Sequence, residues 1–278
     1  VKKFYDDYNL LYNDENIDII YIASLNTSHC KHTITGLEHN KAILCEKPIG
    51  INQYEVEKMI NYSIDQNTFL MEGLWTRFNP AFEQVLEWIR QKSIGKVRHI
   101  SASFCFKAIN NKSSSRLFDL KKGGGSLLDI GIYPLFLAYS ILGIPKSIEA
   151  STILSKKGID LQTAIILSYE NCLATLYSSF SHNKRNMSAL ICGEYGEIFI
   201  DSRWHESSNV KLFSNGKSTI KKFNFVGKGY SYEIQEVNNC LRKGIKESPK
   251  WKLKNSLELI KIIDNVRSLI GVKYPSKN

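Results

Sequence analysis

Short apolar runs alternate with helical segments over the first 72 residues, and this alternation restricts the fold more than any other feature of the chain. The run "DIIYIAS" at 18–24 is apolar, short and β-branched, as is typical of a buried parallel strand. Two more strands are predicted at 42–46 and 68–72, and helices are predicted near 28–40 and 52–66. Strands and helices that alternate in this way form a parallel sheet with helices on its faces. The sequence therefore predicts an α/β doubly wound sheet.

The pattern changes after residue 95, where longer extended runs follow one another. The stretch "IGKVRHISASFCF" is predicted as a long strand, and "GGGSLLDIGIYPLFLAYSILG" as a helix that begins with glycines. Further extended runs between 146 and 214 are separated by short turns, which is typical of a mostly antiparallel sheet. Two helices, near 230–244 and 254–270, close the chain.

These patterns predict two domains of different class, α/β followed by α+β. Residues 1–95 are predicted to form an incomplete doubly wound, Rossmann-like domain. Residues 96–278 are predicted to form a domain with a large, mostly antiparallel open sheet. The last helix is expected to pack back on the first domain.

Composition and charge exclude several classes of protein. The net charge is +10, but the basic residues are dispersed and no helix-turn-helix, zinc-finger or RNA-binding stretch is present, so a nucleic-acid partner is not expected. No apolar run reaches 18 residues, so neither a transmembrane helix nor a membrane partner is expected. The six cysteines form no C-x-x-C pair and the six histidines show no metal-ligand spacing. We therefore expect free thiols, no metal and a cytoplasmic location.

One motif that a dinucleotide-binding sheet normally carries is not found. No strand is followed by G-x-G-x-x-G, and neither "GGG" at 123–125 nor "GKG" at 227–229 has the third glycine at the right spacing. The chain also begins at Val1 in what looks like the middle of a helix. We therefore expect this chain to be the later part of a longer protein.

The stretch "LCEKPIG" at 44–50 ends a buried strand on a charged pair and a proline. Ligands of open α/β sheets bind outside the carboxyl ends of the strands, and Lys47 follows such an end directly. Pro48 fixes its own φ angle and favours an extended conformation at Lys47, which ends the strand. Lys47 is therefore a candidate site residue, although a solvated lysine at a strand end is the alternative.

A second candidate lies in the apolar stretch "GGGSLLDIGIYPL", which contains Asp129 and Tyr133. Residues four apart share one face of an α-helix, and an aspartate in apolar surroundings needs a partner. A tyrosine, a lysine and an aspartate suit proton transfer that accompanies hydride transfer from an alcohol. An unperturbed phenol has a pKa of about 10, and a nearby ammonium lowers it. The alternative is a core aspartate beside a tyrosine that only packs.

Several stretches, taken in order, resemble the glucose–fructose oxidoreductase/inositol dehydrogenase (Gfo/Idh/MocA) family. The strand "DIIYIAS", the N-x-x-H loop after it and the E-K-P motif carry the resemblance in the first domain. The stretches "FLMEGLWTRFNP", "GGGSLLDIGIYPL" and "GKGYSYEIQEVNNCLRKG" are most similar to its dihydrodiol dehydrogenase and D-xylose dehydrogenase branch. The resemblance spans nearly the whole chain.

The resemblance implies roles for individual residues. The catalytic set would be Lys47, Asp129 and Tyr133, with Tyr133 as general acid and base where many relatives have histidine. Residues that match positions near the cofactor or substrate are Ser24, Asn26, His29, Glu46, Lys47, Trp75, Arg77 and Arg116. The alternatives are a turn cap for Asn26, a helix-start residue for His29, a core residue for Trp75, and ion pairs for the two arginines. Leu25 departs from the proline that is usual at its position.

The resemblance also implies a function. Residues 1–95 would bind the nucleotide, and residues 96–278 would bind substrate and form a homodimer through the open sheet. The reaction would be hydride transfer between NADP or NAD, with NADP favoured by the branch, and the CH–OH carbon of a sugar, cyclic polyol or dihydrodiol. The alternative is a truncated, non-catalytic relative that self-associates or binds a sugar without cofactor. The absent glycine motif favours this alternative, and the intact catalytic set opposes it.

Overall fold

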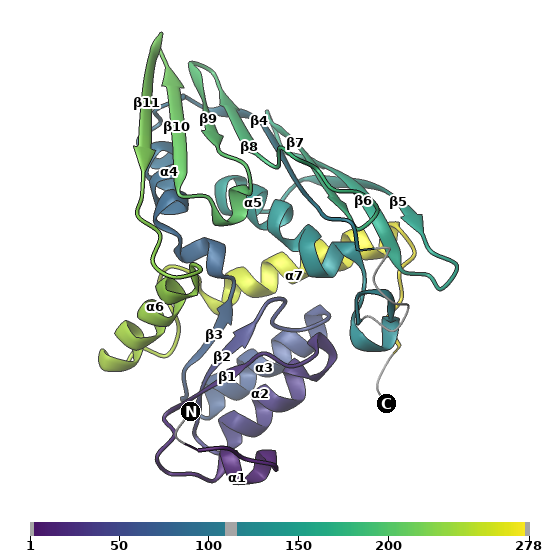
Figure 1. Ribbon diagram of the computed structural model, residues 1–278, viewed down its shortest axis with the longest axis vertical. Coiled ribbons are helices and arrows are strands. Elements are labelled where there is room, and N and C mark those ends of the chain that lie inside the picture. Colours follow the sequence, from purple (N-terminus) through teal and green to yellow (C-terminus); the bar gives the residue numbers. More distant parts are fainter. Residues whose placement is uncertain (1–2, 109–115, 276–278) are drawn as a thin grey trace. The chain divides into compact units, whose positions relative to one another are not determined.

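The computed structural model describes residues 3–108 and 116–275, which belong to two compact units (Figure 1). Residues 1–74 and 233–260 make up the first unit, and residues 75–232 and 261–278 make up the second. This division differs from the predicted boundary at residue 95. The helical pattern of α4 (Pro80–Arg90) continues the alternation of strand and helix before it, so the sequence offers no signal of a boundary at residue 74.

The first unit contains a three-stranded parallel sheet in the order β1-β2-β3, as predicted. The strands are β1 (Ile19–Ile22), β2 (Ala42–Glu46) and β3 (Leu70–Gly73). Helices α2 (His29–Glu38) and α3 (Gln53–Asp65) lie side by side (Figure 1), and α2 packs on β1 and β2. The first four residues of β2 are fully buried, as expected for a central parallel strand.

Local sequence signals explain where α3 begins. The Asn52 side chain accepts a hydrogen bond from the Glu55 backbone N–H at 2.9 Å and so caps the start of the helix. The Glu55 carboxylate in turn accepts a hydrogen bond from the Ile51 backbone N–H at 3.1 Å. These two contacts fix the turn that leads from the E-K-P motif into the helix.

The start at Val1, which was predicted to lie inside a helix, falls outside the described residues. Residues 3–7 are not helical, and the first helix, α1 (Tyr8–Tyr12), is one short turn that starts after Asp7. The Asp7 side chain caps it by accepting from the Asn9 backbone N–H. The aspartate cap interrupts what looks like helical spacing in the sequence.

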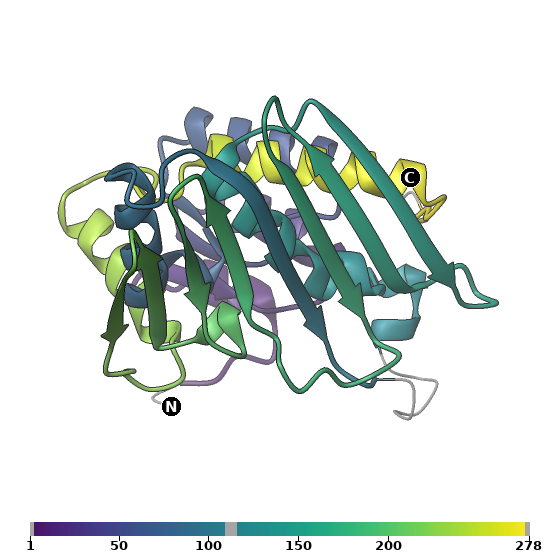
Figure 2. The same cartoon turned by 90° about the horizontal axis from the view of Figure 1, so that it is seen from above.

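The second unit is built on an eight-stranded open sheet in the order β11-β10-β9-β8-β4-β7-β6-β5 (Figure 2). Only the β4–β7 pair is parallel, and the other pairs are antiparallel, so the prediction of a mostly antiparallel sheet is confirmed. The strands are β4 (Val97–Cys105), β5 (Ser147–Leu154), β6 (Asp160–Ser168), β7 (Leu173–Ser179), β8 (Ala189–Gly193), β9 (Gly196–Ile200), β10 (Asn209–Ser214) and β11 (Lys217–Lys222). Every residue of β11 is exposed, so this lysine-rich edge strand has no apolar pattern and was not predicted.

Helices of the second unit cover one face of this sheet. Helix α5 (Ile132–Leu142) packs on β4 and β7, and α4 packs on β10. Alternation along β4 directs the buried side chains of Ile100 and Ala102 toward the helix-covered face and His99 toward the other. Figure 2 shows that α4 and α5 leave this other face uncovered.

Two helices span the remaining part of the chain, α6 (Tyr230–Arg242) and α7 (Leu253–Leu269). The segment between them lies along β3, because the Leu70 backbone N–H donates to the Lys246 carbonyl at 3.1 Å. The six cysteines are free thiols, as predicted. The stretch Leu120–Leu142 is long and apolar enough to cross a membrane, but 83% of its most apolar window is buried inside the structure, as in a core helix of a soluble protein.

Candidate active site

Lys47 lies at the carboxyl end of β2, in the turn that the E-K-P motif forms. Glu46, the last residue of the strand, accepts a hydrogen bond from the Tyr21 hydroxyl of β1 and another from the Lys47 backbone N–H. The Lys47–Pro48 peptide bond is cis. The chain bends at residues 47–50, directly after the strand ends at Glu46, as the sequence predicts.

His29 holds this turn against the end of β1. Its imidazole is fully buried, with Nδ1 2.8 Å from the Pro48 carbonyl oxygen and Nε2 3.2 Å from the Ser24 carbonyl oxygen. Burial lowers the pKa of His29, and the two carbonyl contacts oppose that change. A neutral imidazole has one N–H group, so it donates a hydrogen bond either to the Pro48 carbonyl or to the Ser24 carbonyl, depending on the tautomer. Asn26 is also buried, and it begins the 3₁₀ turn Asn26–Ser28, which leads into helix α2.

Glu72 holds the other side of the same turn. This buried side chain of β3 accepts hydrogen bonds from the Ile49 backbone N–H and from the Trp251 indole N–H, each at 3.1 Å. Trp251 also donates to the Ser256 hydroxyl at 2.9 Å. Burial raises the pKa of Glu72, and the hydrogen bonds it accepts oppose that change. The E-K-P turn is thus held by buried side chains on both flanks.

Two buried polar atoms at the carboxyl ends of these strands have no hydrogen-bond partner among the described residues. They are Ser24 Oγ, just after β1, and Glu233 Oε2, which belongs to α6. An oxygen on Glu233 lies 3.6 Å from the point where a Cβ on Gly73, the last residue of β3, would be. Unpartnered buried polar groups are few in native proteins, and this edge of a parallel sheet is where ligands bind. The residues present therefore fit a polar ligand such as a nicotinamide nucleotide.

In the second unit, Tyr133 of α5 lies in a cluster of aromatic side chains. The Trp75 indole N–H donates a hydrogen bond to the Tyr133 hydroxyl oxygen at 2.8 Å. Phe104 and His205 have ring centroids 5.4 Å from that of Tyr133, and they stack on each other at 4.0 Å. Tyr230 stacks on Trp75 at 4.9 Å. The Tyr133 hydroxyl oxygen thus accepts a hydrogen bond inside a largely apolar wall.

Asp129 lies in a different kind of helical turn from the one expected. Residues Leu127–Gly131 form a π-helical turn that runs into α5, so the α-helical spacing assumed for Asp129 and Tyr133 does not apply there. The Asp129 carboxylate is mostly buried, and both terminal guanidinium nitrogens of Arg116 lie 3.2 Å from one of its oxygens. The structure thus joins two predicted site residues, Arg116 and Asp129, as an ion pair.

Arg77 is engaged elsewhere. Its guanidinium forms an ion pair with Glu83 at 2.8 Å, in the first turn of α4. Asn79 caps the same helix by accepting from the Ala81 backbone N–H at 2.8 Å. An ion pair is the alternative role that the sequence analysis left open for Arg77.

Asp160, which the sequence analysis did not single out, anchors the start of the helix that carries Asp129 and Tyr133. Its side chain is fully buried and accepts hydrogen bonds from the Leu127 backbone N–H at 2.6 Å and the Ser126 hydroxyl at 2.9 Å. A Cβ on Gly125 would lie 2.1 Å from an Asp160 oxygen, and Gly125 also has a φ of 125°, so this position requires glycine. The glycine run therefore serves the helix start rather than a nucleotide.

Burial also acts on the charge of Asp160. It raises the pKa of this carboxyl from 3.8 to about 6, and the hydrogen bonds from Leu127 and Ser126 oppose the change. The aspartate is therefore held as a charged cap at neutral pH in surroundings that disfavour the charge.

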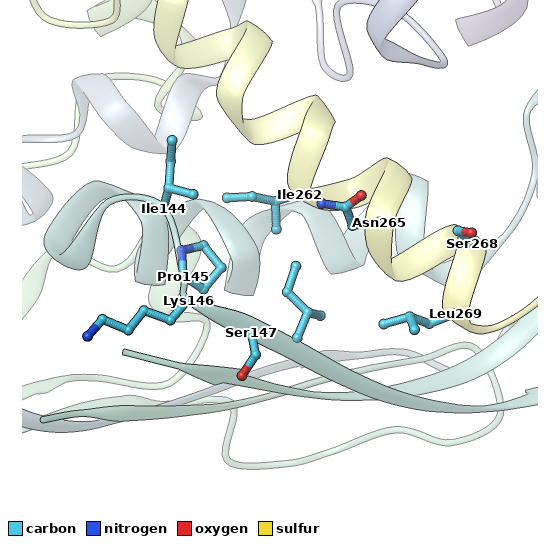
Figure 3. A pocket seen from close by; sticks show the side chains of 9 residues that line it. Ile144, Pro145, Lys146, Ser147, Ile262, Asn265, Ser268 and Leu269 are labelled. Atoms are coloured by element: carbon cyan, nitrogen blue, oxygen red, sulfur yellow. The ribbon is translucent and has the colours of Figure 1, made fainter. Parts of the chain in front are cut away.

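A separate cavity of about 340 Å³ opens between the end of α5, the start of β5 and α7 (Figure 3). Its polar lining is limited to Lys146, Ser147, Asn265 and Ser268, and Lys146 lies 3.9 Å from Glu170. None of the predicted site residues lines it. Across residues 3–108 and 116–275, no three His, Cys, Asp or Glu side chains gather as metal ligands.

Sequence reasoning missed three buried acids, Glu72 and Glu233 in the first unit and Asp160 in the second. Helical spacing was a signal for Glu233, because it shares a face with Val237 and Cys240, both buried. Asp160 comes directly before an apolar strand and after a turn, which is an ordinary place for an exposed aspartate. Its burial follows from contacts with Ser126 and Leu127, which no local pattern reveals.

A segment of each unit matches the model of a known protein family. Residues 1–74 match the oxidoreductase family with an NAD-binding Rossmann fold, and residues 82–199 match the GFO/IDH/MocA C-terminal domain. The chain therefore belongs to the Gfo/Idh/MocA family of oxidoreductases and is an NAD(P)-dependent dehydrogenase.

Relatives and solved structures agree with this assignment. The chain is 35% identical to trans-1,2-dihydrobenzene-1,2-diol dehydrogenase of Xenopus tropicalis, over 99% of this chain and 85% of that protein. A levoglucosan dehydrogenase, solved with NADH and levoglucosan, matches with a TM-score of 0.85 and 18% identity over 98% of this chain and 84% of its own. A 3-ketoreductase from Actinomadura kijaniata, solved with NADP and TDP-benzene, matches with a TM-score of 0.82 and 20% identity over 96% and 82%. These two structures support the fold.

Proposed function

We propose that this protein oxidises the CH–OH carbon of a dihydrodiol, cyclic polyol or sugar, or carries out the reverse reduction, with NADP preferred over NAD. The observation that carries the proposal is the hydrogen bond from Trp75 to the Tyr133 hydroxyl. The dihydrodiol dehydrogenase relative supports the substrate class, because it is similar over nearly the whole chain. The resemblance to the dihydrodiol branch supports NADP.

In this proposal Tyr133 moves the proton. During alcohol oxidation its phenolic oxygen accepts the proton of the substrate hydroxyl, and during reduction it returns that proton. The Trp75 N–H already donates to this oxygen, so it stabilises the negative charge of the phenolate form. The nicotinamide ring, when bound, accepts or supplies the hydride.

Lys47 and Asp129 complete the proposed catalytic set. The ammonium group of Lys47, at the carboxyl end of β2, favours the alkoxide form of a substrate hydroxyl. Asp129, held by Arg116, offers carboxylate oxygens to a second hydroxyl of a diol or sugar. Ser24, Asn26, His29 and Glu46 are proposed to line the cofactor cleft, directly or by holding the E-K-P turn.

The first prediction concerns activity. We expect the purified chain to reduce NADP in the presence of a trans-dihydrodiol or a pentose, with a higher kcat/KM for NADP than for NAD. The measurement is absorbance of the reduced cofactor across a panel of dihydrodiols, cyclic polyols and pentoses. If no substrate gives turnover while sugars still bind by calorimetry, the non-catalytic alternative holds instead.

We also propose that the protein forms a homodimer through the uncovered face of the eight-stranded sheet. Register places Ile166, Leu173, Phe213 and Ile220 on this face, and each is at least 39% exposed. Apolar side chains gathered on one open sheet face favour an interface, and a second copy of the same sheet is self-complementary.

The second prediction tests the dimer. Replacing Ile166 and Leu173 together by lysine places charges on the proposed interface, so we expect the double variant to sediment as a monomer at micromolar concentration where the wild type is a dimer. The matched control is Ile64→Lys, because Ile64 is 67% exposed on α3, which belongs to the first unit and not to this sheet. A wild-type chain that sediments as a monomer contradicts the proposal.

A further inference from the structure

Glu233 is a buried acid at the carboxyl ends of β2 and β3. The side chain is 1% exposed, although it begins on the fourth residue of α6. A Cβ on Gly73 would lie 3.6 Å from the Glu233 Oε2 atom. This Cβ position would also lie 3.5 Å from the Glu46 Cα. The Glu233 carboxyl group therefore lies within van der Waals distance of the backbone at the two strand ends.

The other acids on these elements already have partners. Glu46 accepts from Tyr21 and Lys47, and Glu72 of β3 accepts from Ile49 and Trp251. One turn further along α6, Glu236 accepts from the Ser248 hydroxyl at 2.6 Å and lies 3.8 Å from the Lys250 ammonium. Glu233 Oε2 differs, because no described residue offers it a hydrogen bond.

The surroundings of Glu233 favour the neutral form of its carboxyl group. Burial raises its pKa from 4.5 to about 8, and the charge of Glu46 adds to the effect. A protonated carboxyl group donates a hydrogen bond, which a carboxylate cannot do. Its preferred partner is an uncharged oxygen, since the neighbouring Glu46 carboxylate repels a phosphate.

We propose that the Glu233 carboxyl group binds the nicotinamide cofactor by donating a hydrogen bond to one of its uncharged oxygens, an amide or a ribose hydroxyl. This inference rests on the proposed dehydrogenase function. Ser24 Oγ, the other unpartnered buried atom at this edge of the sheet, offers a second polar contact to the same cofactor. A bound cofactor would supply the partner that Glu233 lacks within the chain.

The test compares two substitutions of Glu233 by cofactor binding. Glu233→Gln keeps a neutral donor of the same shape, so the Kd for NADPH and NADH, measured by their fluorescence, should stay within about threefold of wild type. Glu233→Leu leaves the cofactor oxygen buried without a donor, so the Kd should rise about tenfold or more. The matched control is Glu236→Leu, which removes a partnered acid from the same helix and should lower stability without changing the Kd.

A second readout does not depend on turnover. In the infrared difference spectrum between wild type and Glu233→Gln at pH 7, the wild type should show an additional C=O band of a protonated carboxyl group. Adding cofactor should shift this band. If the wild type binds cofactor and Glu233→Leu binds it equally well, the role of Glu233 is overturned while the proposed function stands. If the wild type binds neither cofactor, both are overturned for this chain.

Discussion

Tyr133→Phe should lower kcat by about 10² to 10⁴ with little change in the Kd for the cofactor, because it removes the group proposed to move the proton. The ring remains, so its contacts with Phe104 and His205 are kept. The loss should fall on kcat more than on KM, because the hydroxyl acts on the reacting oxygen. The measurement is steady-state kinetics with the best substrate of the panel.

The matched control for this variant is Tyr139→Phe. Tyr139 is also buried on α5 and lies six residues after Tyr133. We expect its variant to keep kcat within about twofold of wild type, since its hydroxyl has no part in the proposed chemistry. A Tyr133→Phe enzyme that retains more than a tenth of the wild-type kcat would rule out Tyr133 as the main proton carrier.

Trp75→Phe tests the contribution of the hydrogen bond from Trp75 to Tyr133 while Tyr133 itself is retained. This change removes the indole N–H that donates to Tyr133 and keeps an aromatic ring against Tyr230. A hydrogen bond to a charged oxygen is worth about 1.5 to 3 kcal/mol, which corresponds to about one to two pH units. The pH profile of kcat for oxidation should therefore move to higher pH by up to that amount. An unchanged profile would mean that Trp75 serves only packing.

The sequence predicts best those parts of the fold whose burial is uniform. The bounds of β2 coincide with the predicted run 42–46, because both faces of a central parallel strand are buried and every side chain is apolar until Glu46. The prediction missed β11, because an exposed edge strand of lysine, serine and threonine has no such pattern. The π-helical turn at Asp129 was also missed, because hydrophobic spacing does not distinguish it from an α-helix inside a fully apolar run.

The candidate site shows the same limit. Motif residues such as Lys47 and Tyr133 could be found from local sequence, since their neighbours end a strand or form an apolar helix. The side chains that hold the surrounding segments in place could not be found in this way. Glu72, Trp251 and Asp160 act through contacts between distant segments, and only the folded chain shows that these polar side chains are buried.

Asp160→Ala should have the largest effect on stability of any single change considered. It removes the acceptor of the Leu127 N–H and of the Ser126 hydroxyl, both buried at the start of the helix that carries Tyr133. Leaving a buried donor unsatisfied costs about 1 to 3 kcal/mol, so we expect the free energy of unfolding to fall by about 3 kcal/mol. Chemical denaturation monitored by circular dichroism measures this change.

Asp160→Asn keeps an oxygen acceptor for Leu127 and removes the buried charge, so its effect should depend on pH. The folded protein binds the Asp160 proton more tightly than the unfolded chain, since the pKa rises from 3.8 to about 6. Stability from this group is therefore greatest below pH 3.8 and is lost as the pH rises through 6, by an amount on the order of 3 kcal/mol. The asparagine variant carries no such cost. Its stability relative to wild type should increase between pH 5 and pH 8, and a difference that is constant across this range would show that the charge of Asp160 is not disfavoured in the folded state.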